Sequence, residues 1–347
     1  SAANNALRWE KQVQSNIGFD LTFVNNHFTI NADYFNKSVD GLLFTPSASL
    51  YLGTVPIPQA NIGTTKTSGF DVTLNYRNNP NKKVQLNSSL TFTTATNEVT
   101  STNSDGTAKI LGGYYFNGQS QSVTVFEKGF TPGYFYGFKT NGLFQNAAEV
   151  TASPKQAGAQ AGDIKYVDMN GDGVIDAADK TKIGDPFAKF TLGWNVSVSV
   201  GNFDFVSFVY ASVGNDIYRA FERNANYTNK PREILARWTG ENSTNDARFP
   251  RYSFVDNNNN ARVSDRYVED GSFVKIKNLQ FGYSLPASMT KKGLNKVRFY
   301  FQVKNAYTFT NYTGYDPEIP GGILETGVDR GAYPQPRTFA LGLDIKF

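Results

Sequence analysis

The chain has 347 residues, of which 18% are charged and 14% aromatic, and its formal net charge is +4. Few charges and many rings are unusual for a soluble globular domain and favour strands. The absence of Cys excludes disulfides and thiolate sites, and a single His, His27, leaves little basis for a His-dependent triad or zinc site. The positive charges are dispersed, so no nucleic-acid partner is expected.

Segments that alternate apolar and polar residues recur along the whole chain, which is the pattern of strands with one apolar face. The apolar pairs Phe205-Val206 and Phe208-Val209 break the alternation and predict a bulge. No run of about 18 apolar residues is present, which excludes a transmembrane helix. In chain order, the alternating segments are 17–23, 28–34, 70–76, 84–92, 120–127, 133–139, 190–198, 203–205, 279–285, 297–303 and 339–347.

The connections between these segments fall into two kinds. The short ones have turn chemistry, as at Asn25-Asn26 and Gly201-Asn202. The long ones are rich in Gly, Asn, Ser and Pro. Short turns on one side and long loops on the other are the layout of a bacterial outer-membrane β-barrel, with the long loops extracellular. The expected long loops are 38–66, 96–118, 141–189, 214–270 and 311–336.

The strand count indicates that the chain is part of a barrel. The last strand ends on Phe347, which resembles the terminal aromatic by which outer-membrane barrels are recognised for assembly. If that strand ends on the periplasmic side, an even number of strands must lie between 96 and 189, and 120–127 and 133–139 supply two. The total is about eleven strands, whereas bacterial single-chain barrels use even numbers. The prediction is an all-β fold in which residues 1–347 form the C-terminal part of an antiparallel transmembrane barrel that lacks at least one N-terminal strand.

One loop carries the spacing of a calcium site. Oxygen ligands at positions 1, 3, 5, 7, 9 and 12, with Gly at 6, form the EF-hand loop. We call residues 168–179 the aspartate-rich loop. Its alternative interpretation is a turn whose side chains cap its own backbone. Calcium would be structural here, and its ligands would be Asp168, Asn170, Asp172, the Val174 carbonyl, Asp176 and Asp179, with Asp in place of the usual final Glu.

Other groups give no reason to expect an enzyme. The paired carboxylates Glu269-Asp270 and Asp316 with Glu318 are interpreted as solvated loop charges, so no catalytic residue is predicted. Aromatic loop segments could stack on sugars or peptides, but the interfacial girdle of a barrel is the favoured interpretation. These segments are 114–116, 134–136 and 312–315.

Several stretches together resemble the C-terminal region of the SusC/RagA-type TonB-dependent transporters of Bacteroidetes. The longest is Val-Glu-Asp-Gly-Ser-Phe-Val-Lys-Ile-Lys-Asn-Leu at 268–279. The others lie at 7–10, 16–20, 33–37, 63–71, 134–142, 166–186, 238–239, 249–251, Asn305, 315–318 and 331–339.

The resemblance implies a plugged barrel of the roughly 22-stranded class, of which this chain would supply about half. It also implies TonB-driven import of oligosaccharides or peptides, with a SusD-like lipoprotein as an extracellular lid. The plug domain and the segment that contacts TonB are not in this sequence.

Three alternatives stay open. A passive pore or structural barrel subunit of an outer-membrane assembly would have the same strands. An outer-membrane hydrolase on a small barrel would need a nucleophile and base that the single His27 does not readily supply. A soluble carbohydrate-binding sandwich would have no reason to sort its connections by length.

Overall fold

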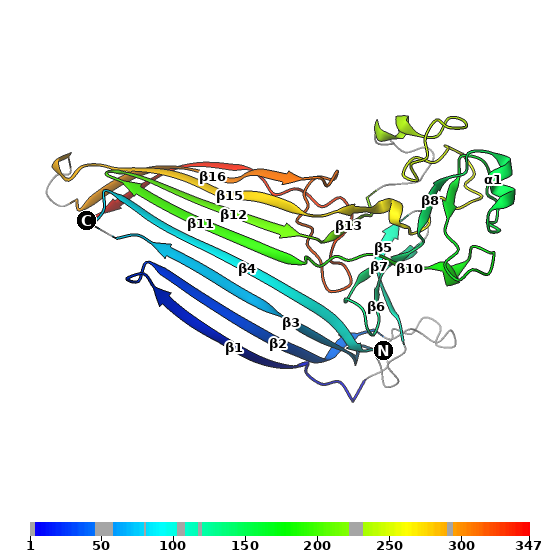
Figure 1. Ribbon diagram of the computed structural model, residues 1–347, viewed down its shortest axis with the longest axis horizontal. Helices are drawn as coiled ribbons and strands as arrows, with labels where there is room; N and C mark the ends of the chain where they lie inside the picture. Colours follow the sequence, from blue (N-terminus) through cyan, green and yellow to red (C-terminus); the bar gives the residue numbers. More distant parts are fainter. Residues whose placement is uncertain are drawn as a thin grey trace.

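Nine long strands make up the main body of the molecule in the computed structural model, which describes residues 4–45, 58–79, 81–102, 108–116, 120–221, 232–289 and 294–347. They are β1 (Lys11–Phe23), β2 (Phe28–Phe44), β3 (Ala60–Arg77), β4 (Val84–Ser101), β11 (Phe190–Val200), β12 (Phe203–Val213), β15 (Phe273–Ser284), β16 (Lys296–Thr310) and β18 (Thr338–Lys346). They form one sheet in the order β1-β2-β3-β4-β11-β12-β15-β16-β18 (Figure 1).

Every neighbouring pair in this sheet is antiparallel. The strands at the two edges, β1 and β18, each have one partner within the described part of the chain. An open antiparallel sheet of this kind is the wall of a barrel segment, as the alternation predicts.

One face of the sheet is apolar from edge to edge, and we call it the outer face. Leu74 in β3 is opposite Leu90 in β4, which is opposite Trp194 in β11. Farther along the sheet, Phe281 in β15 is 55% exposed and Leu341 in β18 is 86% exposed. Large apolar side chains exposed over a whole sheet are what a lipid-facing barrel wall requires.

The opposite, inner face is polar. Near the end with the short turns, Arg298 in β16 donates from Nε and Nη2 to the two carboxylate oxygens of Asp204 in β12, at 2.9 and 2.6 Å. Its Nη1 also donates to Asp344 in β18, at 3.0 Å. Beside it, Tyr300 is directly opposite Gly342, and the tyrosine ring occupies the space that a Cβ at Gly342 would need. These side chains tie β12, β16 and β18 together across the inner face.

The strands extend farther than the alternation indicated. β2 continues to Phe44 and β3 begins at Ala60, so both ends of the expected loop 38–66 are strand. Similarly, β4 continues to Ser101 into the expected loop 96–118. Polar residues interrupt the alternation in these extensions, although Phe44 and Val99 near their loop ends are buried in a cluster with Phe126. The predicted bulge is confirmed, because the register between β12 and β15 shifts at Phe208/Val209.

The predicted count of about eleven wall strands is wrong, since nine lie in the main sheet of the described chain. The segments expected at 120–127 and 133–139 form β6 (Ser120–Phe126) and β7 (Tyr134–Gly137), which belong to a separate sheet. Val123, Thr124, Val125 and Phe126 are all at most 1% exposed, so β6 is buried on both faces. A wall strand keeps one face toward lipid. The number of wall strands between β4 and β11 is therefore zero, which is an even number, as the predicted strand directions require.

The small elements gather at one end of the main sheet (Figure 1). They are β5 (Ile110–Phe116), β8 (Thr140–Leu143), α1 (Ala147–Ala152), β9 (Ile164–Tyr166), η2 (Ala177–Asp179), β10 (Thr181–Gly184), β13 (Asp216–Arg219), η3 (Arg232–Ala236), η4 (Asp265–Tyr267), β14 (Val268–Asp270) and β17 (Val328–Asp329), whereas η5 (Ala287–Met289) follows β15. Their sheets are β10-β7-β6-β5, β14-β13-β17 and β8-β9. No helix in the described ranges is long and apolar enough to cross a membrane.

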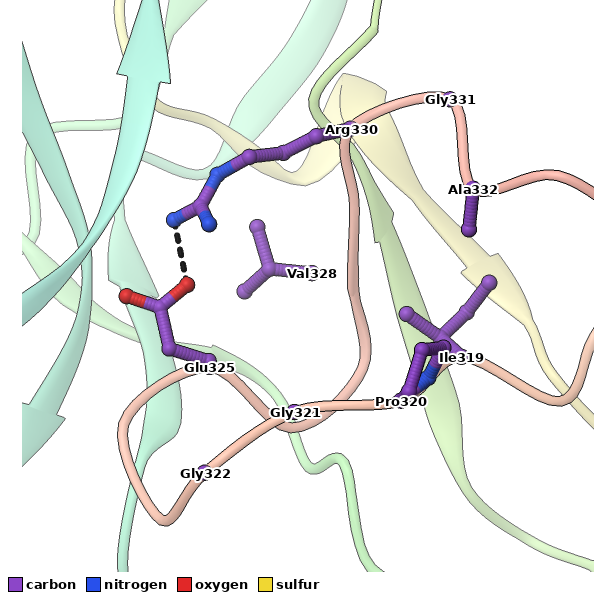
Figure 2. Close-up of a pocket in the computed structure, with 9 residues that line it drawn as sticks. All are labelled: Ile319, Pro320, Gly321, Gly322, Glu325, Val328, Arg330, Gly331 and Ala332. Carbon is purple, nitrogen blue, oxygen red and sulfur yellow. Dashed lines mark ion pairs between the residues drawn. The ribbon is translucent and has the colours of Figure 1, made fainter.

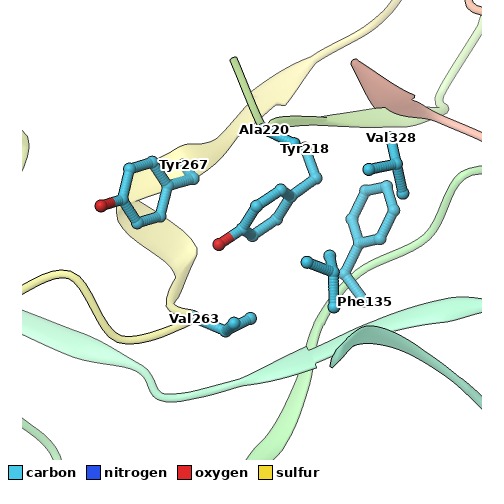
Figure 3. Packing of buried hydrophobic residues seen from close by; sticks show 7 residues of the cluster. Phe135, Tyr218, Ala220, Val263, Tyr267 and Val328 are labelled. Carbon is cyan, nitrogen blue, oxygen red and sulfur yellow. The ribbon is translucent and has the colours of Figure 1, made fainter. Parts of the chain in front are cut away.

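A common core joins the sheets β10-β7-β6-β5 and β14-β13-β17, and we call the small elements at this end of the main sheet the loop body. Figure 3 shows Phe135 of β7 and Tyr218 of β13 packed together, with ring centroids 5.8 Å apart. Tyr267 packs on Tyr218 from the other side, at 5.5 Å. The cluster consists of Val123, Phe135, Tyr218, Ala220, Val263, Tyr267 and Val328, all at most 4% exposed. The loops thus have a hydrophobic core of their own.

Candidate functional site

The segment between β16 and β18, residues 311–337, crosses the loop body, and we call it the strap. Its short strand β17 pairs in parallel with β13. At a position before β17 in the strap, the Leu324 carbonyl accepts a hydrogen bond from Thr124 Oγ1 in β6, at 2.7 Å. Leu324 also packs on the cluster of Phe44 and Phe126, which joins β2 to β6. The strap therefore links the β15–β16 side of the sheet to the β2–β4 side.

A lysine clamp fixes the beginning of the strap to β15. Lys275 is 1% exposed, and its Nζ lies 2.9 and 3.1 Å from the two oxygens of Asp316 and 2.6 Å from Glu318 Oε2. Lys277 Nζ contacts the other oxygen of Glu318, at 2.6 Å. The register shift between Ile276 and Asn278 reverses the alternation set by Phe281 and puts both lysines on the inner face, where the strap lies. The interpretation of Asp316 and Glu318 as solvated loop charges is therefore wrong.

The charge of Asp316 is stabilised in spite of its burial. Burial alone would raise the pKa of this carboxyl, but hydrogen bonds from the Glu318 N–H, the Lys275 ammonium and the Gln335 N–H outweigh it and hold the pKa below its usual value. The carboxylate is thus ionised at neutral pH and attracts Lys275 with full charge.

A second set of polar contacts holds the strap against β13 and β14. Arg219 Nη1 is 2.7 Å from Glu269 Oε1, and Glu269 also accepts hydrogen bonds from the N–H and hydroxyl of Thr313. The Tyr312 hydroxyl donates to buried Asp329, at 2.5 Å, and burial together with this carboxylate raises the tyrosine pKa. Glu269, like Asp316, is paired with a cation instead of being solvated.

Three aromatic residues of the predicted loop segments, Tyr134, Phe135 and Tyr312, are buried and so serve neither as a girdle nor as a ligand surface. Tyr134 and Phe135 are at most 1% exposed and belong to the interior of the loop body. Tyr312 is buried, and only Tyr315 of these four is largely open, at 73%. The side chains of residues 114–116 lie outside the described ones. The girdle and the ligand-contact interpretations of 134–136 are therefore both wrong for its first two residues. The aromatic content of a loop does not by itself indicate whether its rings are buried in a loop core.

The strap also encloses a cavity of about 490 Å³. Figure 2 shows Ile319, Pro320 and Val328 at its apolar side and an ion pair between Glu325 and Arg330 across it. This volume lies in the range of roughly 300–1,000 Å³ that is common for small-ligand sites. No pattern in the sequence predicts this cavity, because its whole lining comes from one largely irregular segment.

The side chains of the aspartate-rich loop cap its own backbone. Asp168 accepts hydrogen bonds from the N–H groups of Gly171 and Gly173, at 2.7 and 2.8 Å. Asp179 is fully buried and accepts from Met169 and Asp176, both at 2.8 Å. Burial opposes ionisation of Asp179, but these N–H groups outweigh it and lower its pKa.

Among the described residues, no group of three or more His, Cys, Asp or Glu is arranged to hold a metal ion. Asn170 and Asp172 likewise bond within the loop, Asp176 caps η2, and Val174 lies 41% exposed. The capping interpretation accounts for these contacts, and calcium at residues 168–179 stays a prediction.

A nine-stranded antiparallel sheet with an apolar outer face, a polar inner face and all long loops at one end defines a segment of an outer-membrane β-barrel. Residues 1–182 match the family described as TonB dependent receptor-like, beta-barrel, and the chain belongs to this family. Its location is therefore the outer membrane, and the prediction that the chain is not an enzyme is confirmed by its membership of a family of receptors and transporters.

Individual relatives agree with this assignment. TonB-dependent receptor P3 of Formosa agariphila is 33% identical over 360 residues, covering 99% of this chain and 35% of the relative. TonB-dependent receptor SusC of Bacteroides thetaiotaomicron is 27% identical and covers 100% of this chain and 33% of the relative. The structure of the RagAB peptide transporter has the same fold, with a TM-score of 0.78, 21% identity and coverage of 100% of this chain and 36% of that chain. The chain thus spans about a third of the length of the relatives it matches.

Proposed function

We propose that the protein to which this chain belongs imports oligosaccharides or peptides across the outer membrane in a TonB-dependent manner, with a SusD-like lipoprotein covering the loop body. The observation that carries the proposal is the construction of the loop body, which is a packed unit with its own core, clamped to the sheet through the strap. Loops that only connected strands would not need a core of seven buried side chains. A firm extracellular platform is suited to docking a lid and holding a substrate.

The residues of this chain would contribute the wall and the platform. The polar inner face, with charged groups such as Arg298 and Asp204, would give a hydrated path for polar substrates. The strap would position its cavity and the exposed ring of Tyr315 above that path. The plug and the contact with TonB would lie in parts of the relatives that this chain does not match.

Transport driven by TonB can be separated from a passive pore by an uptake experiment. Cells with and without the gene are supplied with labelled oligosaccharide and peptide mixtures, and uptake is measured with and without a protonophore. Gene-dependent uptake that stops on protonophore addition supports the proposal, and the mixture that is depleted identifies the substrate class. Gene-dependent uptake that continues without a proton-motive force would instead support the passive pore.

The lid is tested separately by purification. A tagged form of the native protein extracted in mild detergent should retain a lipoprotein of SusD type. Purification without any such partner, from cells that import the substrate, would remove the lid from the proposal.

A further inference from the structure

The cavity of the strap lies between two short limbs of the chain, one before and one after β17, and hydrogen bonds fix the shape of both (Figure 2). In the first limb, the Gly322 carbonyl accepts the N–H groups of Glu325 and Thr326, at 2.8 and 2.9 Å. In the second limb, the carboxylate of Asp329, which is 1% exposed, accepts the Gly331 N–H at 2.8 Å. The cavity is therefore preformed, which lowers the entropy cost of binding a ligand.

The two limbs bring opposite charges to one side of the cavity. Arg330 forms an ion pair with Glu325 through Nη2, and the two side chains are 43% and 34% exposed. An arginine carries five N–H donors in a planar fork that fits a carboxylate. Arg330 is thus placed to hold a carboxylate of a ligand, and Glu325 orients its guanidinium group.

The opposite side of the cavity is aliphatic. Ile319, Pro320 and Val328 line it, and Val328 belongs to the core of the loop body, so this side is firmly held. Gly321 and Gly322 complete the wall with backbone groups that no side chain covers. No aromatic ring is among the described residues that line the cavity, so it offers no flat face on which a sugar ring would stack.

We propose that this cavity binds a peptide through a carboxylate held by Arg330, with an apolar side chain of the peptide against the aliphatic side. This inference rests on the proposed function and narrows its substrate class to peptides. Acidic oligosaccharides share the carboxylate chemistry, but their closely spaced carboxylates would meet the like charge of Glu325. They also have no apolar side chain for the opposite side of the cavity. A neutral oligosaccharide has no charged partner for Arg330.

Retention of small molecules by the purified full-length protein tests this site. The protein in detergent is equilibrated with a peptic digest of casein, with the same digest after methyl esterification of its carboxyl groups, with oligogalacturonate or with maltoheptaose. The fraction retained on ultrafiltration is measured by mass spectrometry. We expect the wild type to retain peptides of the untreated digest at least about tenfold more than esterified peptides, and neither oligosaccharide.

Variants assign the retention to the cavity. Arg330→Gln should lower peptide retention at least about tenfold, and Arg330→Lys, which keeps a positive charge, should restore part of it. Ala332→Phe, which places a ring in the cavity, should also lose the peptide. Arg337→Gln is the matched control, because Arg337 is an exposed arginine of the strap that does not line the cavity. It removes the same charge and should behave like the wild type.

Three results would overturn the proposal. They are equal retention of the untreated and esterified digests, equal retention by Arg330→Gln and Arg337→Gln, and retention of either oligosaccharide in place of peptides. The heat-dependent mobility of the folded barrel on gels verifies assembly of each variant. The comparison of the two digests needs no variant, so it decides the proposal even if Arg330→Gln does not assemble.

The uptake experiment distinguishes failure of this site from failure of the proposed function. Uptake that depends on the gene and on the proton-motive force, without retention of peptide by the purified protein, would overturn the cavity assignment alone. Retention that depends on Arg330, without gene-dependent uptake, would support the site and contradict import.

Discussion

Replacement of Lys275 by Met tests how the strap is held to the sheet. The side chain keeps its length and apolar stem but loses the ammonium that contacts both Asp316 and Glu318. Asp316, at 8% exposure, would then hold a buried charge without its cation. The nine-stranded sheet does not depend on this contact, so we expect the strap to open locally while the barrel stays folded.

The size of the effect follows from burial. Removal of one partner of a buried ion pair costs about 3–5 kcal/mol, because the other charge is left uncompensated. Each 1.4 kcal/mol is a factor of about ten, so the open population of the strap should rise at least about a hundredfold. Lys277 is 31% exposed and has one carboxylate partner, so Lys277→Met should cost only about 0–1 kcal/mol.

Hydrogen exchange of the full-length protein in detergent, followed by mass spectrometry of peptides from 311–337, measures this opening. In Lys275→Met, the amides of the strap should exchange much faster than in the wild type, whereas exchange in β2 and β3 should not change. In Lys277→Met, exchange of the strap should stay near that of the wild type. Equal exchange of the strap in both variants, or no change in either, would refute the clamp as the contact that holds the strap.

Three further predictions concern pH, packing and metal. The lowered pKa of Asp316 means that the stabilisation of the strap by this carboxylate is present at neutral pH and is lost as the pH falls below the ordinary aspartate value of about 3.9. A nitroxide attached to the strap through Gly322→Cys should therefore become mobile only at acid pH. Mobility that rises already near pH 6 would contradict this origin. Gly69→Ala places a Cβ against the backbone carbonyl of Thr94 and should lower stability in urea by about 1–3 kcal/mol, whereas Gly322→Ala, which has open space, should not. If the aspartate-rich loop binds calcium, calcium should slow proteolysis of the loop and Asp168→Asn should abolish this protection; equal cleavage with calcium and with chelator would leave only the capping role.

The alternation of the wall strands was enough to predict their type, direction and outer face. Leu341, Trp194 and Phe281 lie where the period of two places them, and even the bulge at Phe208 was visible as a slip in that period. A barrel wall is a repeating environment, so each strand carries the same signal. The loop ends of β2, β3 and β4 were not predicted as strand, because polar residues interrupt the alternation there.

The loop body could not be predicted in the same way. β6 alternates like a wall strand, but a short alternating segment has the same sequence pattern whether its second face meets lipid or a protein core. The partners of Lys275 lie about forty residues away in the chain, at Asp316 and Glu318, and nothing local to either segment indicates the pairing. Contacts between irregular segments depend on the assembled fold, which local patterns do not encode.

The core of the loop body has a consequence for the order of folding. Val123 and Val328 pack in one cluster although they are separated by most of the chain and come from different connections between wall strands. Closing such a long loop costs entropy that no local contact repays. We therefore expect the cluster to assemble after β15 and β16 have brought the strap into place, and the loop body to be the last part of this chain to become native. If wall strands fail to pair, the loops would therefore lack their native core. A native loop body at the cell surface would then indicate that the wall beneath it is complete.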